Sequence, residues 1–211
     1  MTAQRWQRQA PHLAQTCLFP VTRITLPKAA AVVEAVAEAE VFSLLESFFA
    51  ICRQVKGKHL SGVGVRIDAM LYPKPPMLEM GWPDAWVGLE VKSYELQDQR
   101  KKHATRLLYQ AALYQQSTFM INGVEVEPEI TLIYPPFALI MRESEDDPMY
   151  RDGFTFALGK VAGMFRVLEL SILDGGRDFE VYCHGINPWF SSRSGKSMEC
   201  SLGRKTLRAS R

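Results

Sequence analysis

The strongest constraint on the fold is a short apolar run, Val87 to Lys92, that ends in two opposite charges. Side chains alternate between the two faces of a β-strand, so Glu90 and Lys92 project to the same face of an otherwise apolar element. A second run of the same kind, from Val63 to Tyr72, carries Asp68. Opposite charges at the end of a core strand predict a functional site.

The composition is that of an ordinary globular protein. Hydrophobic residues make up 47% of the 211 positions and charged residues 23%, whereas disordered chains are poorer in apolar residues. This length suits one domain with a sizeable core. Glutamates interrupt the longest apolar stretch before it reaches about 18 residues, so we expect no transmembrane helix and no membrane partner.

The cysteines Cys17, Cys52, Cys183 and Cys200 are far apart in the sequence and form no CxxC pair. We interpret them as reduced thiols, which predicts an intracellular, cytoplasmic protein. The start of the chain has arginines and no acid and is also similar to a transit peptide, although its prolines interrupt an amphipathic helix.

Positive charge is concentrated at the two ends of the chain, although the net charge is only +2. Residues 1–33 contain no acid, and the six cations from Arg193 onward face a single acid, Glu199. Basic ends suit phosphate backbones, because neutralising phosphates releases counterions. The alternative is that both ends are merely solvated.

Helical and strand patterns alternate along the chain, which predicts an α/β fold with helices flanking a sheet. The predicted domains are an N-terminal arm at 1–28, a main domain at 29–190 and a basic tail at 191–211. A proline-rich connection is expected at 73–83. The predicted helices are Ala29 to about Val55 (one or two helices), Gln97 to about Phe119, and about Phe156 to Leu173. The predicted strands are Val63–Tyr72, Trp86–Tyr94, Glu129–Tyr134 and Asp178–Cys183.

Asp68, Glu90 and Lys92 have the side chains that phosphodiester hydrolysis requires. Two carboxylates from adjacent strands can hold Mg²⁺ or Mn²⁺, because these hard cations prefer oxygen ligands. Lys92, on the face of Glu90, would place a cation beside the attacking water or the developing charge. Gln110 and Tyr114 lie four positions apart on the helix that follows, so they share a face.

Asp68, the Glu90-Val91-Lys92 motif and the following helix together resemble the PD-(D/E)XK nuclease superfamily, and Gln110 to Tyr114 is similar to the QxxxY motif of its RecB-like branch. The resemblance implies a restriction-endonuclease-like core, with a central mixed β-sheet flanked by helices. It also implies that Asp68 and Glu90 bind the metal, with the Val91 carbonyl as a third ligand.

By the same resemblance Lys92 is the catalytic lysine, and Gln110 and Tyr114 orient the site and contact nucleic acid. Superfamily members often carry a further acid on the first helix. Glu46 is our choice for this acid, with Glu38 second.

The sequence departs from the family pattern at the residue before Asp68, which is Ile67 rather than proline. The literal Pro83-Asp84 pair is too close to Glu90 to leave a strand and a turn between them, so Asp68 is preferred. The cysteine spacing does not match the iron–sulfur cysteines of some RecB-like nucleases, and we predict no cluster.

Lys101, Lys102 and Arg106 lead toward Gln110 at helical spacing and are candidates for nucleic-acid contacts, with a solvated helix face as the alternative. Trp82 and Trp86 would stack on bases or pack in the protein.

The sequence therefore predicts a metal-dependent DNA nuclease, either an exonuclease or an endonuclease. Two alternatives are an inactive nuclease-fold subunit that binds DNA or assembles with other protein subunits, and an unrelated α/β binding protein. The oligomeric state is left open.

Overall fold

A computed structural model describes most of the chain from residue 34 onward. The described residues are 34–92, 100–141, 148–173, 176–183, 187–197, 200 and 202–203. The N-terminal arm and the acidic segment at 143–147 lie outside them.

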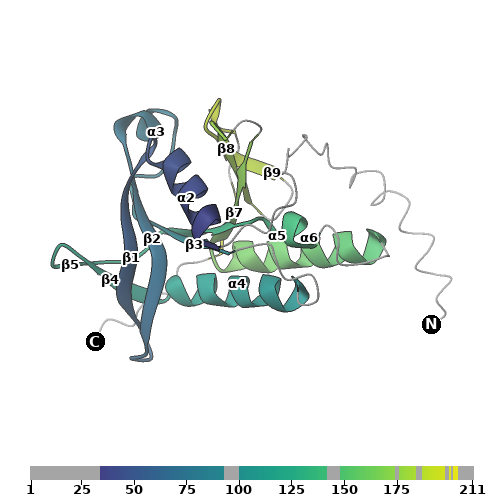
Figure 1. The fold of residues 1–211 in the computed structure, drawn as a ribbon, viewed down its shortest axis with the longest axis horizontal. Helices are drawn as coiled ribbons and strands as arrows, with labels where there is room; N and C mark the ends of the chain where they lie inside the picture. The colour runs from purple at the N-terminus through teal and green to yellow at the C-terminus, as the bar shows by residue number, and fades with distance from the viewer. Residues whose placement is uncertain are drawn as a thin grey trace.

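The helices lie on both sides of one large sheet (Figure 1). They are α2 (Glu34–Leu45), α3 (Pro75–Glu79), α4 (Arg100–Tyr114), α5 (Phe137–Met141) and α6 (Pro148–Met164). The strands are β1 (Phe49–His59), β2 (Gly64–Pro73), β3 (Val87–Val91), β4 (Ser117–Ile121), β5 (Val124–Val126), β6 (Ile130–Tyr134), β7 (Val167–Ile172), β8 (Phe179–Cys183), β9 (Asn187–Ser191) and β10 (Gly195–Lys196).

The strand order in the sheet is β10-β9-β8-β7-β6-β3-β2-β1-β4-β5. Strand β3 pairs antiparallel with β2 and parallel with β6, and β6 pairs parallel with β7. The remaining neighbours are antiparallel. This mixed sheet with helices on both faces confirms the predicted α/β class.

Three groups of buried side chains fill the space around the sheet. The α2 cluster lies between α2 and the sheet and includes Val41, Leu45, Phe49, Leu71, Leu89, Leu132 and Phe179. The α4 cluster lies on the other face and includes Leu107, Ala111, Ile133, Phe137, Leu158 and Val167. The β4 cluster contains Val55, Ile67, Met70, Tyr114, Phe119 and Ile121.

The predicted helix from Ala29 to Val55 is wrong in its second half. Helix α2 ends at Leu45, and β1 begins at Phe49 and pairs with β2 along most of its length. Apolar residues at helical spacing continue past the end of α2, but pairing with β2 satisfies the backbone of β1 and overrides this local pattern.

Two other predicted helices extend too far at their C-terminal ends. Helix α4 ends at Tyr114, before β4, and α6 ends at Met164, before β7. Arg166, with a φ of 59°, ends the α6 turn in the left-handed conformation typical of helix C-termini. Strand β7 alternates apolar and polar residues from Leu168 to Ile172, as strands do, so this segment carried a strand signal that the helix prediction overlooked.

Several short elements do not follow the predicted boundaries. The proline-rich connection contains α3, which begins at Pro75, where proline costs no helical hydrogen bond. Asn122 and Gly123, both with positive φ, form the tight turn between β4 and β5. The boundary predicted at residue 190 falls within β9, and β10 lies beyond it.

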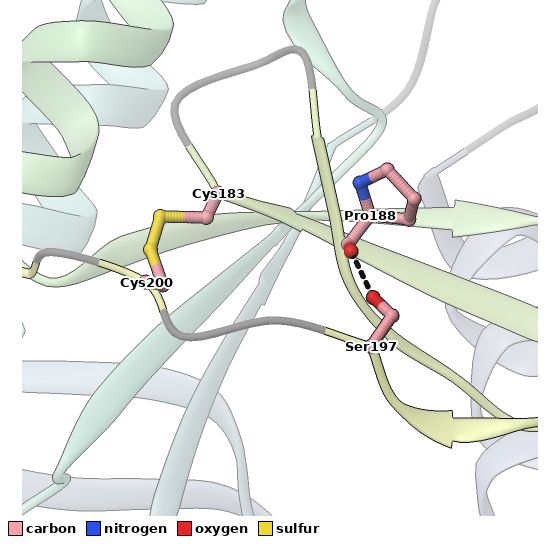
Figure 2. Close-up of a disulfide and its surroundings, with 4 residues drawn as sticks. All are labelled: Cys183, Pro188, Ser197 and Cys200. Carbon is pink, nitrogen blue, oxygen red and sulfur yellow. Dashed lines mark hydrogen bonds between the residues drawn. A yellow bond between two sulfur atoms is a disulfide. The ribbon is translucent and has the colours of Figure 1, made fainter.

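The structure corrects the interpretation of Cys183 and Cys200 as reduced thiols. They form a disulfide, with their Cα atoms 6.3 Å apart, that joins the end of β8 to the chain after β10 (Figure 2). Ser197 Oγ donates a hydrogen bond to the Pro188 carbonyl nearby. Sequence separation says nothing about this pairing, because β9 and β10 bring the chain back. Cys52 is a free thiol.

Among the described residues, no helix is both long enough and apolar enough to span a membrane.

Candidate active site

The candidate site lies where the pairing of β2 with β3 ends. The last backbone pair of this antiparallel ladder is Ala69 with Leu89. Just beyond this pair, the Val91 N–H donates to Asp68 Oδ2 at 2.8 Å. The Asp68 carboxylate therefore takes the place of a backbone acceptor and is held against the backbone of the Glu90-Val91-Lys92 motif.

Strands β1 and β2 both reverse their faces beside this point. In β1, Phe49 packs in the α2 cluster but Val55 packs in the β4 cluster, although strict alternation would place both on one face. In β2, Leu71 and Ile67 differ in the same way. The reversal lies at Gln54, which has a φ of 51°.

Gln54 is a site residue that sequence reasoning missed. The β1–β2 register skips it, since Arg53 pairs with Ala69 and Val55 with Ile67, so it lies opposite Asp68. Its Nε2 is 3.4 Å from Asp68 Oδ1, a long hydrogen bond. A left-handed backbone costs energy for a glutamine, and such strain concentrates at functional sites. No sequence signal marks the position.

Glu90 is a deeply buried charged group, with 2% of its surface exposed. Its Oε1 lies 2.9 Å from Lys92 Nζ, and its Oε2 accepts a hydrogen bond of 3.1 Å from the Tyr114 hydroxyl. Burial, and then the negative charge of Asp68, raise the pKa of Glu90 to about 7, against the opposing effects of Lys92 and Tyr114. The carboxylate of Glu90 is therefore protonated more readily than an exposed glutamate.

Tyr114 connects helix α4 to both acid-bearing strands. Its hydroxyl is 2.9 Å from the Arg66 carbonyl oxygen and 3.1 Å from Glu90 Oε2. One hydroxyl proton cannot serve both acceptors fully, so a proton on Glu90 would complete the network. Burial and the charge of Glu90 raise the pKa of Tyr114 above its usual range. Tyr114, which the sequence placed at the candidate site, thus contacts Glu90 directly.

The other predicted residues of α4 differ in their surroundings. Gln110 lies one turn before Tyr114, and its Oε1 is buried with no hydrogen-bond partner among the described residues. Lys102 and Arg106 are exposed. Lys101 lies in the same helix, but its side chain is outside the described part of the structure.

The structure does not bring Glu46 to this group. Its carboxylate pairs with Arg53 at 2.7 Å, and the guanidinium of Arg53 lies over the Phe42 ring of α2. Tyr114 approaches Glu90 from α4, on the other side of the sheet. Glu38, the second choice, is a half-buried residue of α2.

The remaining candidates have structural partners. Asp84 is exposed and accepts a 2.6 Å hydrogen bond from the Tyr72 hydroxyl. Trp82 is buried against Phe49 and Phe190, as the packing alternative predicts. Trp86 is half-buried, with its ring centre 5.1 Å from that of Tyr72.

A second buried carboxylate, Glu169, lies on the same face of the sheet. Glu90 pairs with Ile133, and Ile133 pairs with Glu169, so the three lie in one row across β3, β6 and β7. Glu169 is 3% exposed; its Oε2 accepts a 2.8 Å hydrogen bond from Phe137 N, and its Oε1 has no partner among the described residues. Burial raises its pKa to about 7. Sequence reasoning missed it because it assigned this segment to a helix.

The acidic pair fits a hard divalent cation in its donor chemistry. Asp68 and Glu90 offer carboxylate oxygens, and the pKa of Glu90 is raised by burial and then by the charge of Asp68, a repulsion that a cation would relieve. Nowhere in the described residues do three His, Cys, Asp or Glu side chains gather into a metal-binding group. An ion held here would therefore take its other ligands from the backbone, water or substrate, as Mg²⁺ commonly does.

Comparisons of the chain with protein-family models, with curated proteins and with solved structures find no match.

Proposed function

We propose that this protein is a Mg²⁺- or Mn²⁺-dependent nuclease that hydrolyses DNA phosphodiester bonds, on a restriction-endonuclease-like core. The observation that carries the proposal is the buried Glu90 carboxylate, held between Lys92 Nζ and the Tyr114 hydroxyl, with a pKa raised by burial and by the charge of Asp68. An acid on one strand, an acid-x-Lys on the next and a tyrosine on the following helix thus meet in space, in the order of the family motif.

Asp68 and Glu90 would hold the cation, with the Val91 carbonyl as a further ligand. A bound cation would neutralise the phosphate and lower the pKa of the attacking water. Val91 N–H orients the Asp68 carboxylate, and Tyr114 fixes that of Glu90. Lys92, with a quarter of its side chain exposed, presents an ammonium beside the reacting phosphate and stabilises the developing negative charge.

The test compares four variants of the full chain on linear, circular, single-stranded and branched DNA, with and without Mg²⁺ or Mn²⁺. Asp68→Asn and Lys92→Met should each slow cleavage by about 100-fold or more, because each removes charge at the reacting centre. Asp84→Asn and Glu46→Gln are the matched controls and should cut at the parent rate, since neither side chain contacts the acidic pair.

Folded Asp68→Asn and Lys92→Met proteins that cut as fast as the parent would refute the assignment. A parent that binds DNA but cuts none of these substrates with either metal would favour the inactive, DNA-binding alternative. Loss of activity in Asp84→Asn alone would move the acidic role to the Pro83-Asp84 pair.

A further inference from the structure

Beyond the candidate site, β1 and β2 continue as a hairpin that extends past α4 in Figure 1. The pairing of β2 with β3 ends at Ala69, whereas β1 and β2 stay paired from there to Lys58 and Gly64. We call residues 54–68 the β1–β2 arm. One edge of the arm pairs with β4 at Gly57, Lys58 and His59.

The outer face of this arm is basic. The stretch from Val55 to Ile67 contains Lys56, Lys58 and Arg66 and no acid. All three cations are exposed, and among the described residues none forms an ion pair with an acid. Val55 and Ile67 turn inward to the β4 cluster, so the positive charge is confined to the outer face.

Lys56 and Arg66 lie directly opposite each other in the β1–β2 register. Like charges facing each other across an antiparallel pair are destabilising. An anion between or along them would remove this repulsion. The arrangement therefore favours a ligand that presents closely spaced negative charges.

The tip of the arm is apolar. Leu60 and Val63 flank the turn and are 57% and 63% exposed. The turn is fixed by the backbone, because His59 N–H donates to the Val63 carbonyl and Gly62 N–H donates to the His59 carbonyl. Proteins that bind the minor groove of duplex DNA often insert exposed apolar side chains, leucine among them, between base steps.

The arm is continuous with the candidate site. The Arg66 carbonyl accepts the Tyr114 hydroxyl, and Asp68 follows Arg66 by two residues. A polyanion lying along the arm would therefore reach Asp68 at the base of the arm, whereas Tyr114 contacts the opposite face of the arm. This continuity favours a nucleic acid over a lipid surface as the partner.

We propose that the β1–β2 arm binds duplex DNA, with Lys56, Lys58 and Arg66 along one phosphate backbone and the Leu60–Val63 tip in the minor groove. The proposal deepens the proposed nuclease function by naming the surface that guides the duplex to the site.

The experiment measures binding of the full chain to a fluorescent 30-base-pair duplex in EDTA over a series of salt concentrations. The arm variant carries Lys56→Gln, Lys58→Gln and Arg66→Gln. The control carries Lys160→Gln and Arg177→Gln, which remove positive charge at exposed positions on α6 and before β8, and an arm double variant, Lys56→Gln with Arg66→Gln, matches its change in net charge. A further variant, Leu60→Ser with Val63→Ser, tests the tip.

Each lost phosphate contact should lower the slope of log affinity against log salt by about 0.9. For the arm variant, which lacks three cations, this slope should therefore be shallower by about 2 to 3, and binding should be at least about 10-fold weaker. The control should keep the slope of the parent. The tip variant should bind several-fold more weakly with an unchanged slope. Melting temperatures equal to or above that of the parent would show that the arm variant is folded.

Equal slopes for the arm variant and the control would overturn the proposal, as would a parent that does not bind duplex. So would preferential binding to vesicles containing phosphatidylserine. Because binding is measured without a divalent metal, a parent that binds through the arm but never cuts would refute the nuclease function and leave the arm proposal standing.

Discussion

The substitution Glu169→Gln should make the protein's stability less dependent on pH. Glu169 is buried under the beginning of α5, where Phe137 N–H donates to its Oε2. A glutamine keeps a carbonyl oxygen for this donor and has almost the same shape. The substitution therefore removes the ionisation of this side chain and little else.

The direction follows from the pKa of Glu169, which burial raises from 4.5 to about 7. Between these values the folded protein binds more protons than the unfolded chain, so stability falls as the pH rises through this window. The difference between the pKa values of Glu169 in the folded and unfolded states corresponds to about 3 kcal/mol of unfolding free energy, at about 1.4 kcal/mol per pKa unit. This contribution is fully present below pH 4.5 and is lost above about pH 7.

The measurement is urea unfolding of the parent and of Glu169→Gln at a series of pH values from 5 to 9, followed by tryptophan fluorescence. At pH 5 the variant should be as stable as the parent or less stable, because one amide N–H lacks a partner. Between pH 5 and pH 9 the variant should gain about 2 to 3 kcal/mol of unfolding free energy relative to the parent. Glu125→Gln, at an exposed position in β5, is the control.

A difference between parent and Glu169→Gln that stays constant across this pH range would refute the reasoning. It would mean that Glu169 ionises in the folded protein as it does in the unfolded chain. A pH-dependent change of the same size in Glu125→Gln would point instead to a general effect of net charge.

Two further predictions concern the backbone of β1. In Gly57→Ala the new Cβ would lie 2.6 Å from the Thr118 carbonyl oxygen of β4. The unfolding free energy should therefore fall by about 2 kcal/mol, and the backbone amides of β4 should exchange their hydrogens faster. Unchanged hydrogen exchange in β4 would contradict this. Gln54→Gly should raise the unfolding free energy by about 1 kcal/mol, because glycine adopts the φ of 51° without strain. Gln54→Ala keeps the strain and should show no such gain in thermal or urea unfolding; an equal gain in both variants would contradict this explanation.

The order of the main elements and the core of the site could be predicted from local patterns. The strand carrying Asp68, the strand ending in Glu90 and Lys92, and the helix carrying Tyr114 were each expected near their observed positions. Apolar periodicity and chain punctuation act over a few residues, so they are readable without knowing the fold. Tyr114 does contact Glu90, as the spacing of the motif led us to expect.

Features that depend on distant pairing could not be predicted. The chain from Phe49 becomes a strand because β2 pairs with it, and the left-handed Gln54 lies where β1 and β2 both reverse their faces. Glu169 reaches the row of Glu90 only through the register of β6 and β7, and Cys183 meets Cys200 only because β9 and β10 return the chain. Local sequence thus determined the α/β order and placed Glu90, Lys92 and Tyr114 on elements whose contacts bring the three side chains together. Strand register decided which buried charges became neighbours, because it is set by contacts between segments far apart in the chain.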